Sequence, residues 1–461
     1  MGTTAIKFDL FSSNNQIIYS EQKRVQVSEA DKKEQIQNPI LILNEMKSEI
    51  KKIALIYKIN QIVFSTAMHT LIPIFDDEAS KMYLWSDGRA VNEIKEFKKN
   101  SPEKASEFYQ KTGTPIHGMS PFAKILHFKE NAEWFTTVKY WIGLKEFLMS
   151  YFVGDKLIDY ANASATGLFN SNTFVWDKEI LNFLDIKENQ LGKLVDTNQL
   201  FNILPHVAKA LNIPLDTKIC IGASDGVLAS YASYKGTESK VSLTVGTSAA
   251  IRCLSDERVL SKTEDTFCYY LSKDYWVIGG ASNNGGKLLE WASELFFEDK
   301  TEIFNHISNS LNKSPIGANE LIFMPYLNGE RAPLWDESVR GTFEGISIHH
   351  KRSDFIRAIC EGILLNLKKI YDLLNISKEE TIALSGGFFN NINLVKETAT
   401  IFQSRCIKSD FNEPTFGGAL LCLSNLKIPN DKEKIIETSD RDKENQYQEV
   451  YQNFVNKLSK I

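Results

Sequence analysis

The sequence of 461 residues is poor in cysteine and has no long hydrophobic run. Its six cysteines are scattered, with no C-x-x-C pair and no His-Cys cluster, which argues against a disulfide framework or a zinc site and favours buried, reduced thiols. No apolar run reaches the roughly 18 residues that a membrane helix requires. The best one, residues 140–153, is interrupted by Lys145 and Glu146. No secretory pattern opens the chain, so we expect a cytoplasmic protein without a membrane span.

An excess of charge of one sign is also missing. The chain has 53 basic and 58 acidic residues and a net charge of −5, which offers no basic footprint for nucleic acid. Hydrophobic residues make up 43% and charged residues 24%, which excludes disorder as a description of the whole chain. At roughly 150 residues per domain, the length predicts two or three domains.

Strand-like and helix-like segments alternate along the chain, which is typical of an α/β protein. Residues 5–11 alternate like a strand, residues 39–56 have helical spacing, and residues 61–65 form a β-branched run. The pattern therefore predicts helices packed on β-sheets.

An internal similarity links residues 1–10 to residues 245–254. Both segments begin with a small turn, Gly2-Thr3-Thr4 in the first and Gly246-Thr247-Ser248 in the second, and both continue into an amphipathic strand. Glycine permits the tight turn, while the hydroxyls and consecutive backbone N–H groups can hold an anion. We interpret the pair as two lobes facing one phosphate chain, the alternative being two coincidental hairpin turns.

The segment 222–226, Gly-Ala-Ser-Asp-Gly, follows a predicted strand and has two chemical interpretations. As G-x-S-x-G it matches a nucleophile elbow with Ser224 as nucleophile, which requires a histidine such as His306, His349 or His350. Alternatively, Asp225 is a general base at a strand end. A structural turn without chemistry is the third option.

Further motifs indicate a nucleotide and a polar ligand. Ser385-Gly386-Gly387 follows the strand predicted at residues 381–384, where glycines allow a flat ring to approach the backbone. No P-loop or G-x-G-x-x-G motif is present. Polar and aromatic residues cluster at positions 64–69, 85–89 and 113–121, as expected for a pocket that binds a polyhydroxylated molecule.

Together these motifs resemble the FGGY family of carbohydrate kinases over essentially the full length. The resemblance rests on the two Gly-Thr turns, Asp225, Ser385-Gly386-Gly387, residues 163–168 and residues 340–345. Residues 64–72, 113–117, 266–268 and 283–286 look most like gluconate kinases, and xylulose kinases are the nearest alternative.

The resemblance implies an actin-like, ribonuclease H-like α/β fold of two lobes, each with a mixed five-stranded sheet flanked by helices. Residues 1–235 would form the sugar-binding lobe and residues 236–461 the ATP-binding lobe. It also implies ATP and Mg²⁺, with no assigned metal ligands, and closure of the lobes over a cleft that excludes water. A homodimer stays open as an option.

Residue roles follow from the same resemblance. Asp225 would accept the proton of the terminal hydroxyl of D-gluconate as 6-phospho-D-gluconate forms. The sugar acid would contact Met68, His69, Trp85 and Arg89, with Arg89 binding its carboxylate. The nucleotide would contact Gly2, Thr3, Thr4, Gly246, Thr247, Ser248, Gly286, Gly386, Gly387 and Asn391. The alternatives are a xylulokinase-like enzyme, a non-catalytic sugar-binding or regulatory protein, and a serine hydrolase.

The first Gly-Thr turn departs from the family pattern, in which a strand and an aspartate precede it. The second turn has a leading strand at residues 240–245, but the sequence places only Met1 before Gly2. We therefore expect open sheet edges beside residues 5–11, a first lobe of marginal stability and impaired phosphoryl transfer.

Overall fold

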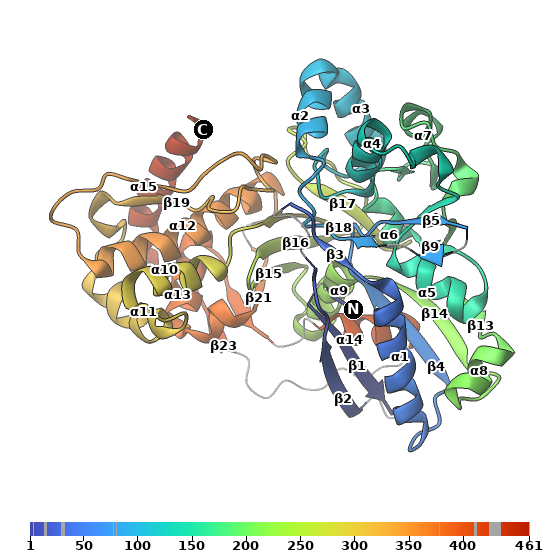
Figure 1. Ribbon diagram of the computed structural model, residues 1–461. Helices are drawn as coiled ribbons and strands as arrows, with labels where there is room; N and C mark the ends of the chain where they lie inside the picture. Colours follow the sequence, from blue (N-terminus) through green and yellow to red (C-terminus); the bar gives the residue numbers. More distant parts are fainter. Residues whose placement is uncertain are drawn as a thin grey trace.

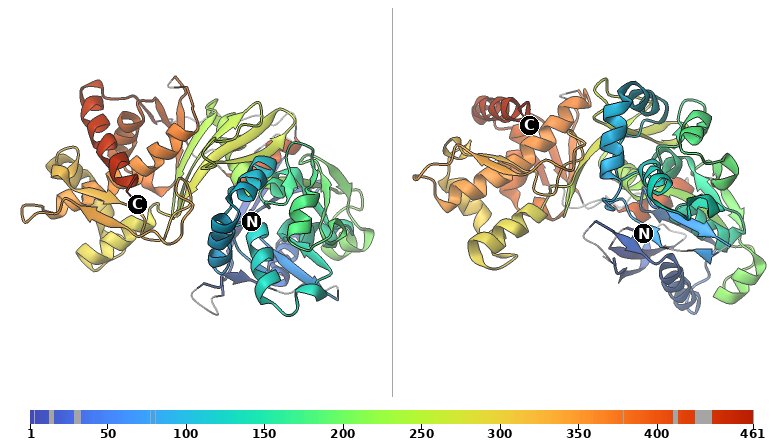
Figure 2. Two further views of the ribbon diagram at one scale, coloured as in Figure 1. Left: turned by 90° about the horizontal axis from the view of Figure 1, so that it is seen from above. Right: turned by 45° about the horizontal axis from the view of Figure 1, so that its top comes forward.

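The computed structural model describes residues 1–2, 4–12, 16–28, 33–76, 78–79, 81–377, 379–409, 413–423 and 435–460. Two lobes lie side by side in Figure 1: the first is mostly blue to green and the second mostly yellow to red, while the orange-red helix of residues 414–422 lies among elements of the first lobe. The view from above in Figure 2 shows the long strands of the second lobe reaching toward the first.

The first lobe is built from small sheets. β4 (Gln61–Thr66) lies parallel to β14 (Lys218–Ser224), and β13 (Leu200–Asn202) flanks β14 on its other side. β1 (Ala5–Phe11) pairs with β2 (Ile17–Arg24) as a separate antiparallel hairpin. The remaining strands are short: β3 (Ile36–Gln37) with β7 (Met82–Tyr83), β5 (Ile72–Phe75) with β6 (Glu78–Ala79) and β8 (Tyr140–Ile142), β9 (Leu157–Asp159) with β12 (Lys193–Val195), and β10 (Phe169–Asn170) with β11 (Val175–Trp176).

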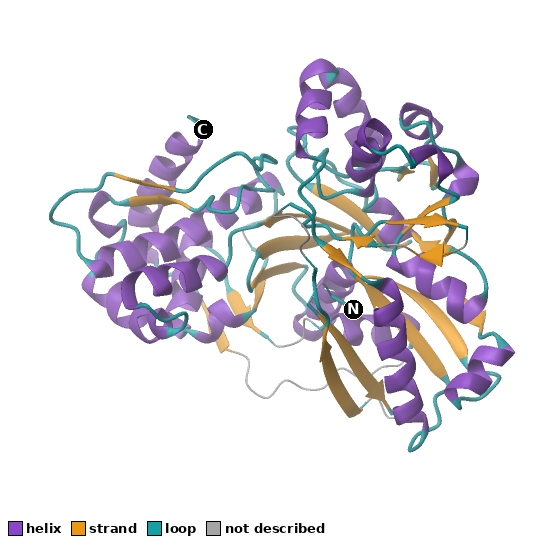
Figure 3. Cartoon of the chain, viewed as in Figure 1, coloured by secondary structure: helices purple, strands orange, loops and turns teal. Residues whose placement is uncertain are grey.

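Helices surround these strands (Figure 3). They are α1 (Pro39–Ala54), α2 (Val91–Asn100), α3 (Pro102–Thr112), α4 (Pro121–Asn131), α5 (Leu144–Val153), α6 (Tyr160–Ser164), α7 (Lys178–Phe183), α8 (Pro205–Leu211) and α9 (Asp225–Thr237). α1 illustrates how the sequence sets an end: Pro39 occupies the first turn, and the Asn38 side chain accepts from the amides of Ile40 and Leu41.

The second lobe has one sheet of seven strands in the order β17-β18-β16-β15-β21-β22-β23. These strands are β15 (Val241–Val245), β16 (Ala249–Ser255), β17 (Phe267–Ser272), β18 (Tyr275–Ser282), β21 (Ile382–Ser385), β22 (Cys406–Lys408) and β23 (Ile435–Glu437). A separate pair is formed by β19 (Ile322–Met324) and β20 (Thr342–Glu344). The helices are α10 (Lys287–Phe297), α11 (Glu302–Lys313), α12 (Arg352–Leu373), α13 (Ile392–Phe402), α14 (Pro414–Cys422) and α15 (Arg441–Leu458).

The lobes are joined by hydrogen bonds between β17 and the ends of α3 and α6 in the first lobe. The amide of Cys268 donates to the Gly113 carbonyl at 2.8 Å, and that of Tyr270 donates to Ser164 Oγ at 3.1 Å. α14 also reaches the first lobe, where it contacts α9, β4, β14 and β1. These contacts hold the two lobes against one another.

The α/β class and the two-lobed actin-like fold are confirmed, but the expected sheet sizes are not. The hairpin β17–β18 and the antiparallel strand β23 extend the second sheet to seven strands. In the described part of the first lobe, the sheets have two or three strands each, and β1 pairs only with β2.

The expectation of reduced cysteines is wrong for two of the six. Cys220 of β14 and Cys422 at the end of α14 form a disulfide across 202 residues of sequence. α14 packs on β14 and brings the two thiols together, a proximity that spacing along the chain does not encode. The other four, Cys253, Cys268, Cys360 and Cys406, are free.

Among the described helices, none has both the length and the apolar character that crossing a bilayer demands.

Candidate active site

The site is organised by two parallel strands that end at the same edge. β4 and β14 pair so that Thr66 lies opposite Ser224. Met68 lies two residues beyond Thr66 and Asp225 directly follows Ser224, and the Met68 backbone hydrogen-bonds the Asp225 carboxylate. Carboxyl ends of parallel strands are the usual place for ligands in α/β proteins.

Asp225 is the first residue of α9 and lies at the boundary between the lobes. Its carboxylate accepts from the amide of Gly226 at 2.8 Å. Burial raises the pKa of Asp225, while the Met1 ammonium, the Gly226 amide and Arg252 oppose the rise. A partly desolvated carboxylate with an elevated pKa is suited to accept a proton.

Ser224, the rival nucleophile, is buried, and its hydroxyl has no hydrogen-bond partner among the described residues. The histidines proposed for a triad are engaged elsewhere. His306 lies 3.1 Å from Glu302, and His350 contacts the Ser347 amide and the Asn319 carbonyl. Among the described residues no histidine is hydrogen-bonded to the Ser224 hydroxyl, as a catalytic triad would require.

His69 sits between the lobes in a fixed protonation state. Burial lowers the pKa of His69 to about 3, so the ring is neutral near pH 7. Nδ1 lies 2.7 Å from the Ala165 carbonyl oxygen, which requires Nδ1 to carry the proton. Nε2 is thus left as an acceptor, and the ring lies 6.0 Å from that of Tyr269 in the second lobe.

Trp85 and Arg89, both predicted to contact the sugar, have different neighbours. Trp85 stacks under Arg331 of the second lobe, whose Cζ lies 4.6 Å from the centre of the indole ring. Arg89 forms ion pairs with Asp87 at 3.1 Å and Glu34 at 3.3 Å. The structure thus brings Met68, His69 and Trp85 to the lobe boundary, while the charge of Arg89 is already balanced.

The second Gly-Thr turn connects β15 and β16 and is held by a neighbouring glycine pair. The amide of Gly286 donates to the Gly246 carbonyl at 2.6 Å, and that of Lys287 donates to the Thr247 carbonyl at 3.3 Å. A Cβ atom at Gly285 would lie 2.6 Å from the Ser248 carbonyl oxygen. Only glycine permits this approach, which brings two backbone turns together as a cradle for anionic groups.

The glycines after β21 lie at the same edge as this turn. β15 and β21 are parallel, with Thr244 opposite Ser385. Gly386 has φ +97 and packs against the Val245 backbone, whereas a Cβ atom at Gly387 would meet nothing within 4 Å. Gly387 therefore borders open space, as a nucleotide site requires. The Asn391 side chain instead caps α13 and contacts Ser308.

The first Gly-Thr turn is only partly described. The amide of Gly2 donates to the Ala5 carbonyl, and the Thr4 carbonyl accepts from the Val25 amide, both at 2.9 Å. Thr3 lies outside the described residues. The Met1 ammonium donates to the Ser65 carbonyl of β4 at 2.8 Å, which places this segment near Asp225.

A buried glutamate that sequence reasoning did not assign holds the glycine loop of the second lobe in place. Glu330 is fully buried, and its carboxylate accepts from the Ser282 hydroxyl at 2.7 Å, the Asn283 amide at 2.9 Å and the Asn366 side chain at 3.0 Å. It thereby fixes the loop that leads to Gly285. The signal was its position in the 328–335 loop, which is dense in glycine, arginine and tryptophan.

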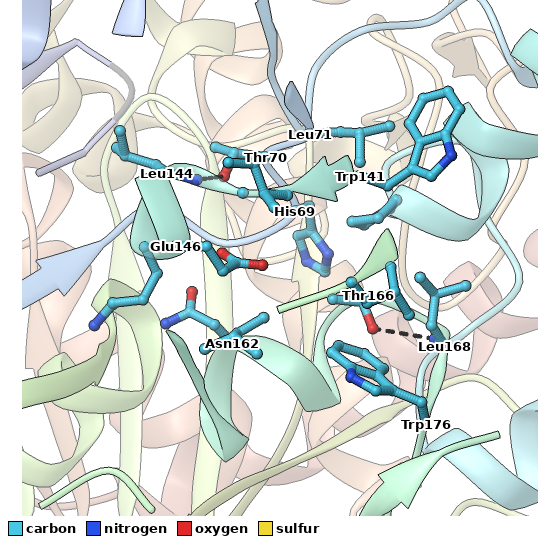
Figure 4. Close-up of a pocket in the computed structure, with 16 residues that line it drawn as sticks. His69, Thr70, Leu71, Trp141, Leu144, Glu146, Asn162, Thr166, Leu168 and Trp176 are labelled. Atoms are coloured by element: carbon cyan, nitrogen blue, oxygen red, sulfur yellow. Dashed lines mark hydrogen bonds between the residues drawn. The ribbon is translucent and has the colours of Figure 1, made fainter. Parts of the chain in front are cut away.

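A small cavity of about 30 Å³ lies beside His69 in the first lobe (Figure 4). Its lining includes Glu146 and Trp141, each with a buried polar atom that has no partner among the described residues. Burial raises the pKa of Glu146 to about 7. A cavity holds about one water per 10–15 Å³, so this one has room for two waters and not for a sugar.

A magnesium site was expected without assigned ligands. Among the described residues, no group of three acidic, histidine or cysteine side chains is arranged to hold a metal ion. Mg²⁺ commonly binds through water, nucleotide phosphates and one or two carboxylates, and Asp225 supplies one carboxylate at the lobe boundary. The residues present fit an ion that arrives with a nucleotide, where it would neutralise charge on the phosphates.

A base at one lobe, a glycine cradle at the other and an actin-like arrangement of both define a two-lobed phosphotransferase. The chain belongs to the FGGY family of carbohydrate kinases. The family's N-terminal domain matches residues 1–231 and its C-terminal domain matches residues 241–425.

Individual proteins that the chain resembles are also sugar or sugar-acid kinases. The gluconokinase of Bacillus subtilis (strain 168) is 32% identical over 439 residues, covering 91% of this chain and 85% of the relative. The xylulose kinase of the same organism is 26% identical over 436 residues, covering 91% and 86%. Two crystal structures from Lactobacillus acidophilus, titled gluconate kinase and ligand-bound xylulose kinase, each have a TM-score of 0.92 and 31% identity. Each covers 99% of this chain, together with 96% of the xylulose kinase and 95% of the gluconate kinase.

Proposed function

We propose that the protein transfers the γ-phosphate of ATP to the terminal hydroxyl of a sugar acid, D-gluconate being converted to 6-phospho-D-gluconate. The observation that supports this proposal is the placement of Asp225 beside Met68 at the ends of β14 and β4, with Arg252 of the second lobe against Gly226. The identities to gluconokinase and xylulose kinase, 32% and 26%, support the sugar acid over the pentulose.

Each group has a role in the reaction. Asp225 accepts the proton of the attacking hydroxyl as its oxygen bonds to the γ-phosphorus and ADP leaves. His69 Nε2 accepts a hydrogen bond from another hydroxyl of the sugar chain. Backbone amides of the Gly246 turn face the phosphates, while Gly286 and Gly387 leave room for the nucleotide. Mg²⁺ would stabilise the charge on the phosphates.

The two lobes would each bind one of the two substrates. We assign residues 1–235 to sugar binding and residues 236–461 to ATP binding. Since ATP is available in the cytoplasm, we place the reaction there.

The test is a coupled assay of ADP release with D-gluconate, D-xylulose and glycerol at equal concentrations. The proposal predicts that kcat/KM for D-gluconate exceeds the other values at least tenfold. Comparable or greater turnover of D-xylulose would overturn the sugar-acid assignment, and no turnover of any of the three would overturn the kinase assignment.

A further inference from the structure

We propose that Arg252 and Arg331, here called the arginine pair, bind the carboxylate of the sugar acid, with the hydroxyl of Tyr269 as a further donor. This inference rests on the proposed function and adds the residues that select an acid over a neutral sugar.

Arg252 points from the second lobe toward the first. Side chains on a strand alternate between faces, and its neighbours at i±2, Ala250 and Leu254, pack in the cluster that includes α9, whereas Ile251 packs in the core of the second lobe. Nη2 and Nε of Arg252 lie 3.1 and 3.3 Å from the place that a Cβ atom at Gly226 would occupy. Its buried Nε has no hydrogen-bond partner among the described residues.

Arg331 approaches the same boundary from the loop after β19. It stacks on Trp85, and its Nη2 donates to the Ser282 carbonyl at 3.1 Å, but its buried Nε also lacks a partner among the described residues. The adjacent Glu330 is occupied by the Ser282 and Asn366 side chains and by backbone amides. Nε of Arg331 is therefore available to a ligand.

The two guanidinium groups act on one another and on one hydroxyl. Burial lowers the pKa of Arg331 to about 10, Glu330 opposes this, and the charge of Arg252 lowers it further. Both arginines lower the pKa of Tyr269 against the larger effect of its burial. The Tyr269 hydroxyl is buried without a partner in the described structure. Burial also lowers the pKa of Arg252, while Asp225 opposes this, so each guanidinium has one carboxylate nearby but keeps an unpartnered Nε among the described residues.

Two desolvated cations and an unpaired hydroxyl at one boundary favour an anionic ligand, because an anion relieves their repulsion and supplies acceptors. A carboxylate suits guanidinium groups well, since it can accept two parallel hydrogen bonds. The sugar end is favoured over the ATP phosphates because Arg331 lies on Trp85, and its charge reaches His69. Arg89, the alternative anchor, is paired with Asp87 and Glu34.

The test compares D-gluconate with D-glucitol, a neutral polyol of the same chain length, by calorimetry without ATP and by the ADP-release assay. Arg252→Gln, Arg331→Gln and Tyr269→Phe are measured with the exposed Arg405→Gln as control. We expect each arginine variant to weaken gluconate binding roughly 10- to 100-fold, the range for a lost hydrogen bond to a charged group. Glucitol binding should change less than threefold, and Arg252→Lys should recover part of the loss.

Equal losses for both ligands, a loss confined to the KM for ATP, or wild-type binding of gluconate no tighter than glucitol would overturn the proposal. A loss specific to gluconate in Arg89→Gln, without one in the arginine pair, would do the same. If Arg331→Gln fails to fold, Arg252→Gln decides, because no hydrogen bond of that side chain is recorded among the described residues. Since binding is measured without ATP, this result is independent of whether the wild type transfers phosphate.

Discussion

The two sides of the lobe boundary differ in chemistry. The first lobe presents acceptors: the carboxylate of Asp225 and the neutral Nε2 of His69. The second lobe presents the positive charges of Arg252 and Arg331, together with the Gly246 turn that the amides of Gly286 and Lys287 hold in place. The acceptor side suits hydroxyls that must donate or lose a proton, and the donor side suits anions. A reaction between a polyol and a nucleotide needs both surfaces, which explains why the site lies between the lobes.

The largest effect should come from removing the acceptor that takes the proton. Asp225→Asn should lower kcat by about 10²- to 10⁴-fold in the ADP-release assay, because a positioned general base contributes that range. Ser224→Ala is the matched control: this adjacent side chain makes no cap hydrogen bond to α9, so activity should stay within about threefold of wild type. Equal losses in the two variants would show that the acceptor side has been assigned to the wrong residue.

The next largest effect should come from a substitution at the Gly246 turn of the second lobe. Gly285→Ala would place Cβ 2.6 Å from the Ser248 carbonyl oxygen and 2.8 Å from that of Gly246, so the phosphate turn must shift. We expect the KM for ATP to rise about tenfold or more, the equivalent of about 1.4 kcal/mol. Gluconate binding without ATP should be unchanged. Gly418→Ala in α14, where the nearest atom is 3.4 Å away, is the control. A rise in the KM for gluconate alone would contradict the division between the two sides.

The pH dependence of kcat/KM tests whether Asp225 is the proton acceptor. Because burial raises the pKa of Asp225, kcat/KM should fall as the pH drops through that elevated pKa and the carboxylate takes up a proton. His69, with a pKa of about 3, stays neutral and should add no step between about pH 5 and 9. His69→Gln should raise the KM for gluconate about 3- to 30-fold but keep the acid limb. If kcat/KM of that variant no longer fell at low pH, the titrating group would be His69 instead of Asp225.

The last comparison concerns the two hairpins at the Gly-Thr turns, β1–β2 and β15–β16. β15 is buried and paired on both sides, by β16 and β21, whereas β1 pairs only with β2 in the described structure and is mostly half-buried. Backbone amides of β1 and β2 should therefore exchange hydrogen about tenfold faster or more than those of β15 and β16. Equal protection of both hairpins would contradict the prediction that the first lobe is the less stable one.

Local patterns predicted the elements and the ends of strands well. The strand at residues 5–11, the helix at residues 39–56 and the position of Asp225 after a strand were all readable from alternation, spacing and small residues. These features depend on neighbours in sequence, which is why a single chain reveals them.

Long-range partners could not be read in this way. The Cys220–Cys422 disulfide and the pairing of Arg89 with Glu34 depend on which elements pack together. The extension of the second sheet to seven strands has the same origin. Arg252 gave one local signal, a charged residue inside an apolar strand, but only the packing of β16 against the first lobe gives that signal a meaning.

The central claim is that the two sides orient the sugar acid, with its carboxylate at the arginine pair and its terminal hydroxyl at Asp225. Phosphorus–carbon correlation NMR of the product formed from ATP and uniformly ¹³C-labelled D-gluconate tests this directly. The account predicts a single product in which phosphorus couples to the terminal hydroxymethyl carbon. Phosphate on any other carbon, or a mixture of positions, would contradict it.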